Sequence, residues 1–316
     1  MEERTMALND KDIVIVGYAR SAIGDFMGAL KDVALVDLCT TVTKAALERA
    51  GVQPESVDEL GMGCIYKHGN GGNPGRQIQI KAGMPSTSWA YTVDQQCASG
   101  MKALDVVSRS LMTDGCELAV VVGGDVMSRA PYLSLNGRSG FRMGDVKLID
   151  SLTQDALKCA IAGYHMGLTA ENLADQYGIS REEQDELAVL SHQRAIAKVL
   201  SVTSKGVPAE VMGIGPAYVI PKAIELAGLR PEDIDYYEIN EAFAAQFLAC
   251  NRELKLSMDK VNRNGSGIGL GHPVGMTGAR IITACISELI ASGEKYGVAS
   301  LCVGGGPAMA TVVEIL

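Results

Sequence analysis

Two stretches of this 316-residue chain repeat the same order of elements. The first runs from CASGMKAL at residues 97–104 to VVVGG at 120–124, and the second from GMTGARII at 275–282 to LCVGG at 301–305. Each stretch has a turn of small residues, a helical pattern and an apolar strand that ends in a glycine pair. A repeat of this kind predicts a fold built from two related halves.

The pattern of apolar residues indicates that both halves are α/β units. In the first half it predicts strands over 11–19, 57–65, 89–93 and 118–122, and helices over 33–50 and 97–113. In the second half it predicts strands over 234–239, 298–303 and 308–316, and helices over 215–226, 241–254 and 276–290. Buried strands that alternate with helices are typical of a largely parallel, helix-covered sheet.

The segment between the halves is more polar, and Ser180–Glu183 has the pattern of a capping box that opens a further helix. We therefore predict three regions: an N-terminal half over 1–126, an inserted loop domain over 127–198, which looks truncated, and a C-terminal half over 199–316.

Composition excludes several classes of protein. A net charge of −9 argues against a general nucleic-acid or anionic-membrane binder, and no apolar run approaches the ~18 residues that a membrane span needs. The N-terminus resembles neither a signal nor a transit peptide. The eight cysteines contain no C-x-x-C pair, which favours reduced thiols in a cytoplasm over a zinc site or a disulfide framework. We expect a cytoplasmic protein without a metal.

Cys97 lies between a predicted strand and a predicted helix. Backbone N–H groups and the helix dipole at such a position favour a thiolate, so the pattern predicts a lowered thiol pKa and a nucleophile. The alternative is a buried structural cysteine at a tight turn.

A second feature is the glycine-rich stretch GSGIGLGHPVG at 265–275. It does not match a dinucleotide fingerprint, because His272-Pro273 interrupts the glycines. A histidine held by a proline before a helix favours a positioned acid or base. The alternative is a loop histidine whose ring is satisfied by the backbone.

Two further strand ends carry polar groups. Cys302 ends a predicted strand and precedes three glycines, whose free N–H groups can form an oxyanion hole. Asn240, in the sequence NEAF, follows another strand, and its amide can fix a water or a carbonyl oxygen. Sites in α/β sheets lie at strand ends, so the four features together predict one site.

In this combination the sequence resembles the thiolases. The resemblance is carried by QQCASGMKAL (95–104), YHMGLTAEN (164–172), INEAFAAQ (239–246), GIGLGHPVGMTGAR (267–280) and LCVGGG (301–306), in the order that the family has them. It implies a thiolase-like α/β fold, with two related halves whose mixed five-stranded sheets form a layered α-β-α-β-α arrangement, plus an inserted loop domain. The block at 164–167 further resembles the biosynthetic, acetoacetyl-CoA branch, an acyltransferase.

The resemblance implies a role for each site residue. Cys97 would be the nucleophile that becomes acetylated, with His272 accepting its proton. Cys302 would remove the α-proton of a second acetyl-CoA. Asn240, through a water, and His272 would hold the thioester oxygen as it gains enolate charge. The N–H groups of Cys97 and Gly304 would hold the other tetrahedral oxygen.

The resemblance also implies substrates and assembly. Positions near the pantetheine and thioester are matched by His165, Met166, Leu157, Ala242 and Phe243. The expected reaction is a reversible Claisen condensation of two acetyl-CoA to acetoacetyl-CoA and CoA, through an acetyl-cysteine and ping-pong kinetics. CoA thioesters are the expected partners, with no separate cofactor and no metal, and the protein would be a homodimer or homotetramer.

One departure from the family follows Lys198, where its members place several tens of residues that include a strand and CoA contacts. The internal repeat agrees, because no β-branched run follows Gly124 as 308–316 follows the second glycine motif. The sequence is either incomplete here or has a true internal deletion, and a stable domain rarely tolerates a lost strand. The alternative function is thus a catalytically impaired thiolase-like subunit or scaffold. A β-ketoacyl synthase is disfavoured, because such enzymes usually pair their cysteine with two histidines.

Overall fold

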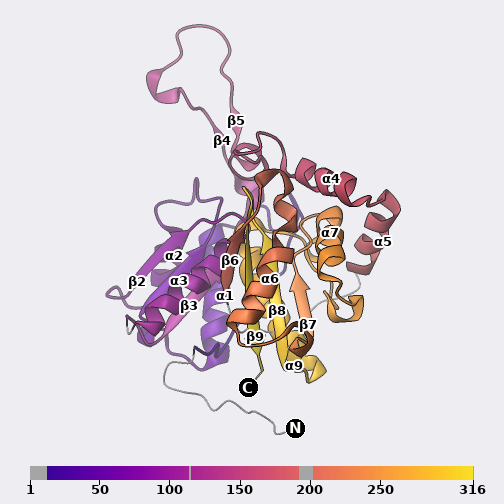
Figure 1. Cartoon of the computed structure of the whole chain (residues 1–316). Helices are drawn as coiled ribbons and strands as arrows, with labels where there is room; N and C mark the ends of the chain where they lie inside the picture. The colour runs from indigo at the N-terminus through magenta and orange to yellow at the C-terminus, as the bar shows by residue number, and fades with distance from the viewer. Residues whose placement is uncertain (1–12, 114, 192–201, 316) are drawn as a thin grey trace.

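The computed structural model describes residues 13–113, 115–191 and 202–315. Within them two α/β halves lie side by side, and a long excursion that contains the short pair β4 (Tyr132–Leu133) and β5 (Ile149–Asp150) extends away from both (Figure 1). The helices α4 (Met166–Tyr177) and α5 (Arg181–Ser191) follow it, beside the C-terminal half. The predicted capping box at the start of α5 is confirmed, since Ser180 and Glu183 exchange side-chain-to-backbone hydrogen bonds.

The described sheet of the N-terminal half is parallel, with strand order β2-β1-β3. Its strands are β1 (Glu59–Gly63), β2 (Trp89–Val93) and β3 (Ala119–Gly123). The outer helices α1 (Leu35–Ala50) and α2 (Pro74–Ala82) share an apolar core with this sheet, around Leu35, Leu60 and Ile78. The helix α2 was not predicted.

The sheet of the C-terminal half has the order β6-β9-β8-β7 in the described residues. Its strands are β6 (Thr203–Gly206), β7 (Tyr236–Ile239), β8 (Tyr296–Cys302) and β9 (Pro307–Glu314). β7 and β8 are parallel, and β9 lies between β8 and β6, antiparallel to both. The outer helices α6 (Gly215–Leu226) and α7 (Ala244–Leu254) share a second apolar core with this sheet.

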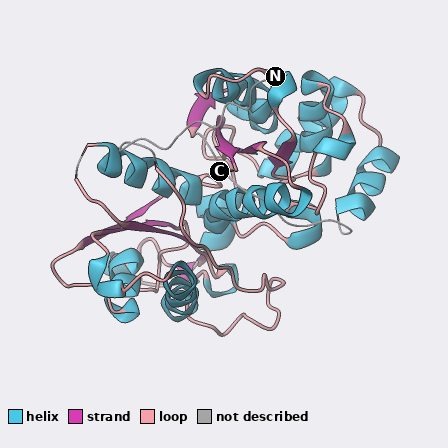
Figure 2. Ribbon diagram, turned by 90° about the horizontal axis from the view of Figure 1, so that it is seen from below, coloured by secondary structure: helices cyan, strands magenta, loops and turns pink. Residues whose placement is uncertain are grey.

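A central layer of helices joins the halves. It contains α3 (Ser99–Met112), which packs on β1 and β3, and α9 (Val274–Ser292), which packs on β3 of one sheet and on β7 and β8 of the other. The two helices approach closely through glycines: a Cβ on Gly100 would lie 2.8 Å from the Ala279 nitrogen, and one on Gly278 would lie 2.6 Å from the Met101 nitrogen. The predicted two-half, layered α/β fold is therefore confirmed, and Figure 2 shows helices on both faces of a sheet seen edge-on.

By length and hydropathy α9 is apolar enough to span a membrane. Its position explains this composition, because ten of its residues are buried within the protein. It also carries Arg280, which is buried and ion-paired with Glu238. We interpret α9 as the central core helix of the fold.

Two sequence predictions are wrong in detail within the described residues, one about both sheets and one about the N-terminal half. The sheets of the described residues have three and four strands where five were expected. The strand predicted over 11–19 is not formed within residues 13–19, and Val14, Ile15 and Val16 there are 46%, 41% and 59% exposed. A β-branched run becomes a strand only where a neighbour can pair with its backbone.

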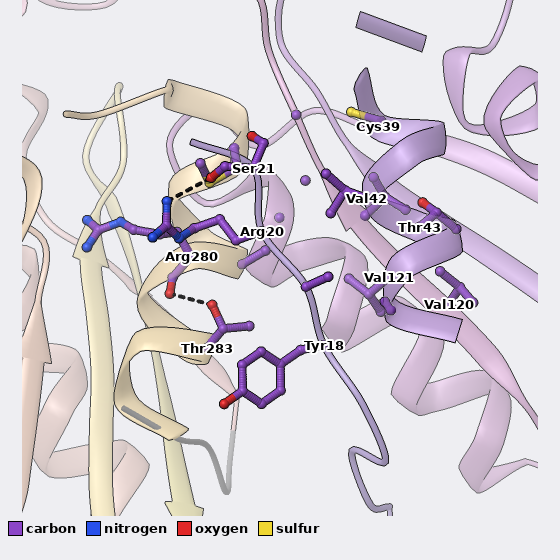
Figure 3. Close-up of a pocket in the computed structure, with 18 of the residues that line it drawn as sticks. Tyr18, Arg20, Ser21, Cys39, Val42, Thr43, Val120, Val121, Arg280 and Thr283 are labelled. Carbon is purple, nitrogen blue, oxygen red and sulfur yellow. Dashed lines mark hydrogen bonds between the residues drawn. The ribbon is translucent and has the colours of Figure 1, made fainter. Parts of the chain in front are cut away.

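A cavity of about 990 Å³ lies where that neighbour would be. Its walls come from residues 13–26, α1, β3, α3 and α9, and Figure 3 shows Tyr18, Val42, Val121 and Thr283 around it. In the C-terminal half β9 lies between β6 and β8, whereas no described strand lies between residues 13–19 and β3. The gap that the sequence predicts after Lys198 falls within residues 192–201, which lie outside the described residues.

Candidate active site

Cys97 lies in the turn between β2 and α3 and is 5% exposed. Ser99 holds this turn: its hydroxyl accepts from the Gln95 N–H at 2.9 Å and donates to the Gln96 carbonyl at 2.6 Å. Gln96 has a φ of 48°, a left-handed conformation that non-glycine residues rarely adopt. The local sequence therefore fixes the thiol at the start of α3, as predicted.

The predicted lowering of the Cys97 pKa is wrong for this state of the protein. Burial raises the pKa of the thiol to about 11, although the Gly304 N–H and its own N–H act in the opposite direction. Desolvation of the thiolate outweighs these donors and the helix end. The resting group is therefore a thiol that has to give up its proton as it reacts.

Cys302 is the last residue of β8, in the C-terminal half, and lies near the Cys97 thiol. Burial, and then the neighbouring Cys97, raise the pKa of Cys302 well above its ordinary value. In the turn that follows, a Cβ on Gly304 would lie 2.8 Å from the Met166 Cε and 3.5 Å from the Gln96 Cγ, so both side chains lie close to this residue. Two cysteines from different halves and a backbone donor thus meet in one place, as the sequence predicted.

His272 lies just before α9, and Thr277 fixes its ring. The Thr277 hydroxyl lies 2.7 Å from the His272 Nδ1 and 3.0 Å from the Pro273 carbonyl oxygen. Its one proton goes to the carbonyl, which can only accept, so the hydroxyl accepts from Nδ1–H. This leaves Nε2 free to take a proton. Burial and then the charge of Arg280 lower the pKa of His272 to about 4, so the imidazole is neutral near pH 7.

Asp125 ties the start of α9 to the N-terminal half, and sequence reasoning missed it. One carboxylate oxygen accepts from the Gly275 N–H at 2.6 Å, and the other from the N–H groups of Ile65 and Tyr66 at 3.1 and 2.9 Å. Burial raises the pKa of this carboxyl to about 6. An acidic residue directly after the first glycine pair, where the second repeat has a third glycine, was the available signal.

Asn240 follows β7 and is fully buried. Its backbone N–H donates to the Ser300 carbonyl at 2.8 Å, and its Oδ1 accepts from the Arg280 Nη2 at 3.2 Å. Its Nδ2 has no hydrogen-bond partner in the described part of the chain. A buried amide with an unused donor is ready to hold an oxygen atom.

The residues expected near the acyl and pantetheine groups lie at the start of α4 and of α7. His165 precedes α4, and its Nδ1 accepts from the Gly167 N–H at 3.0 Å. Met166 packs in a small core with Phe243 and also covers Gly304. Leu157 is half-buried next to Lys158, which forms a β-bridge with His165.

The structure thus brings Met166 next to Gly304, in the turn after Cys302, with His165 and Phe243 beside it. Ala242 precedes Phe243, and its N–H donates to the Gln246 side chain at 3.2 Å. Neither Cys97 nor Cys302 lines the large cavity of the N-terminal half, which reaches the His272 loop and, on α9, Arg280.

The metal-ligating residue types are not gathered into a cluster: in residues 13–113, 115–191 and 202–315 no three His, Cys, Asp or Glu side chains are placed to share an ion. All eight cysteines are buried and free.

Fold and site together define a class of protein: two related α/β halves with a thiol site at their junction. Comparison with known proteins gives the family. Residues 13–213 match the family model described as thiolase, N-terminal domain, and residues 193–315 match thiolase, C-terminal domain. The chain belongs to the thiolase family.

Individual relatives agree over nearly the whole chain. An acetyl-CoA acetyltransferase of Escherichia coli is 36% identical over 392 positions, covering 97% of this chain and all of the relative. A solved acetyl-CoA acetyltransferase of Syntrophomonas wolfei is 38% identical with a TM-score of 0.90, covering 95% of this chain and 98% of that one. Human mitochondrial 3-ketoacyl-CoA thiolase is 30% identical with the same TM-score, covering 95% and 97%.

The first of these alignments supports the predicted gap. Its 392 positions exceed the 316 residues of this chain, so the relative has positions to which this chain contributes no residue.

Proposed function

We propose that this thiolase is an acetyl-CoA C-acetyltransferase, which joins two acetyl-CoA into acetoacetyl-CoA and CoA and runs the reaction in both directions. The observation that carries the proposal is the meeting of Cys97, Cys302 and the Gly304 N–H at the junction of the halves. Several relatives at 34–36% identity are named acetyl-CoA acetyltransferases, which supports the choice of substrate.

In the first half-reaction the Cys97 proton passes to the free Nε2 of His272 as the sulfur attacks the thioester carbonyl. A bond forms between Cys97 and the acetyl carbon, and the bond to the CoA sulfur breaks. The raised pKa of Cys302 means that it starts as a thiol, so it can protonate the departing CoA thiolate. The products are acetylated Cys97, protonated His272 and a Cys302 thiolate.

In the second half-reaction the Cys302 thiolate removes the α-proton of a second acetyl-CoA. The resulting carbon nucleophile attacks the acetyl group, and the bond to the Cys97 sulfur breaks. His272 then returns the first proton to Cys97, so the site is regenerated. Protonated His272 and the Asn240 amide, through a water, hold the enolate oxygen, while the N–H groups of Cys97 and Gly304 hold the oxygen on the acetyl carbon.

Five further residues from the sequence analysis belong to substrate binding in this proposal. His165, Met166, Leu157, Ala242 and Phe243 would line the path of the pantetheine and acyl groups. The small space over Gly304, closed by Met166, favours a short acyl chain.

We further propose that the protein acts in the cytoplasm as a homodimer or homotetramer, with CoA thioesters as its only substrates and with neither a metal nor a separate cofactor. The free state of all eight cysteines supports a reducing compartment. Light scattering on the purified protein measures the assembly, and a monomeric mass would contradict this part.

Product formation by matched cysteine variants tests the proposed activity. We expect Cys302→Ser to lose acetoacetyl-CoA synthesis while Cys97 still becomes acetylated, and Cys97→Ala to lose both. Cys116→Ala serves as the control, because it removes a buried thiol that lies outside the site and donates a hydrogen bond to Glu59. Parent-like synthesis by Cys97→Ala would end this proposal.

Two observations favour a second candidate function. The gap relative to the relatives and the cavity beside β3 leave the N-terminal half incomplete, as in an impaired subunit or scaffold. That candidate predicts no CoA turnover by the purified chain, so turnover at a normal thiolase rate would dismiss it.

A further inference from the structure

The guanidinium of Arg280 lies behind the site and is almost fully buried. Its Nη1 donates to the Glu238 Oε1 at 3.2 Å. Its Nη2 donates to the Asn240 Oδ1 at 3.2 Å and to the Ser266 hydroxyl at 3.3 Å. Arg280 lies on α9, on the wall of the N-terminal cavity near Thr283 (Figure 3).

The chemistry of the guanidinium decides which end of the Asn240 amide faces it. Arginine has only donors, whereas an amide has an acceptor at one end and a donor at the other. A flipped Asn240 would place its NH₂ group against the Arg280 NH₂ group and leave two buried donors facing each other. The oxygen therefore faces Arg280, and Nδ2, which has no partner in the described residues, is aimed elsewhere.

The amide also has little room to turn away. A Cβ on Gly267 would lie 2.8 Å from the Asn240 Oδ1, so the chain passes close to the amide oxygen on that side. On the far side Glu238 holds the arginine and also accepts from the Ser266 hydroxyl at 3.0 Å. The arginine, the carboxylate and the amide form one buried, connected network.

We propose that Arg280 is a positioning residue for the proposed reaction: it holds the oxygen of Asn240, so that the Asn240 NH₂ is presented to the oxygen atom that gains charge during condensation. The proposal rests on the function proposed above for Asn240. It gives α9 two positioning tasks, since Thr277 fixes the ring of His272 one turn before Arg280.

This role separates the two half-reactions. Acetylation of Cys97 does not need the Asn240 amide, whereas condensation needs it to stabilise the enolate. Arg280→Met should therefore lower condensation by about 100-fold, the usual size of a lost oxyanion donor. Acetylation should change much less, since Arg280 acts on it only through the pKa of His272. Arg280→Lys keeps one charged donor and should recover part of the loss.

A double-mutant cycle tests whether Arg280 acts through Asn240. We would measure acetylation and condensation rates for the parent, Arg280→Met, Asn240→Ala and the double variant, with Arg280→Lys as the variant that keeps the buried charge if the methionine variant does not fold. If Arg280 acts through the amide, the double variant is no slower in condensation than Asn240→Ala alone.

Several outcomes would overturn the inference, in ways that are distinguishable. Losses that multiply in the double variant, equal losses in both half-reactions, or a parent-like Arg280→Met enzyme overturn the positioning role and leave the proposed function intact. A parent that forms no acetoacetyl-CoA, or an Asn240→Ala enzyme as fast as the parent, overturns the inference together with the function on which it rests.

Discussion

The two halves of the molecule share one sequence pattern but complete it to different extents. In the C-terminal half β9 fills the position between β6 and β8, and its side chains are buried on both faces. In the N-terminal half β3 is an edge strand in the described residues, and the apolar run at 13–19 stays unpaired beside a cavity. The difference teaches that a strand is specified by its neighbours as much as by its own residues.

The largest expected effect comes from placing one carboxylate in each half and comparing the loss of stability. Val313→Asp places a carboxylate at a fully buried position of β9 and should cost more than about 4 kcal/mol of folding free energy. Val16→Asp makes the same change in the unpaired run, where the side chain is 59% exposed, and should cost less than about 0.5 kcal/mol. Urea unfolding of both variants checks this. Equal losses would show that residues 13–19 are paired in solution.

The next effect concerns the carboxylate that joins the halves. Asp125→Ala leaves the N–H groups of Ile65, Tyr66 and Gly275 without their acceptor, so we expect a loss of about 3 kcal/mol. Asp125→Asn keeps one acceptor oxygen and should lose less. Thermal unfolding of the three proteins measures the order, and an unchanged Asp125→Ala protein would contradict the assigned role of this carboxylate.

A pH dependence follows from His272. Its pKa is about 4 in the folded protein and about 6.5 when unfolded, so the unfolded state binds more protons between these values. This group therefore makes stability fall as the pH drops from 6.5 towards 4. His272→Asn should flatten that slope, as measured by the urea midpoint at several pH values. A slope unchanged by the substitution would mean that the ring is not buried in solution.

The smallest effect compares two hydroxyls. Thr43, on α1 at the cavity, and Thr311, on β9, are both buried, and within the described residues neither Oγ1 has a hydrogen-bond partner. A buried hydroxyl without a partner costs free energy of folding, and replacement by valine removes that cost. Thr311→Val should therefore stabilise the protein by about 1 kcal/mol. Thr43→Val should gain less, because the cavity beside it can admit water. An equal or larger gain at Thr43, seen in urea unfolding, would indicate a dry, filled site.

Much of the fold could be read from the sequence, because its elements are long and periodic. The bounds of α1, β2 and α6 agree with the predicted ranges to within two residues. Cys97, Cys302, His272 and Asn240 were found because each lies close to the end of a predicted strand or the start of a predicted helix. The helix α2 was missed because its apolar pattern is weak and its start depends on Asn73, whose side chain accepts from the Arg76 N–H.

The features that the sequence did not reveal depend on contacts between distant residues. The network of Arg280 with Glu238 and the bonds of Asp125 join elements far apart in the chain, so no local pattern indicates them. The thiol pKa of Cys97 was predicted in the wrong direction, because burial by the other half outweighs the local helix end. The domain boundaries and the roles of the site residues stay predictions.

The most direct test of the central claim, that Cys97 is the nucleophile at the junction of the halves, is to locate the acetyl group after brief exposure to acetyl-CoA. Intact mass and peptide mapping of the purified chain provide the measurement. We expect one acetyl group per chain, on the Cys97 peptide, which disappears when CoA is added back. No acetyl group, or one on another of the eight cysteines, would contradict the account.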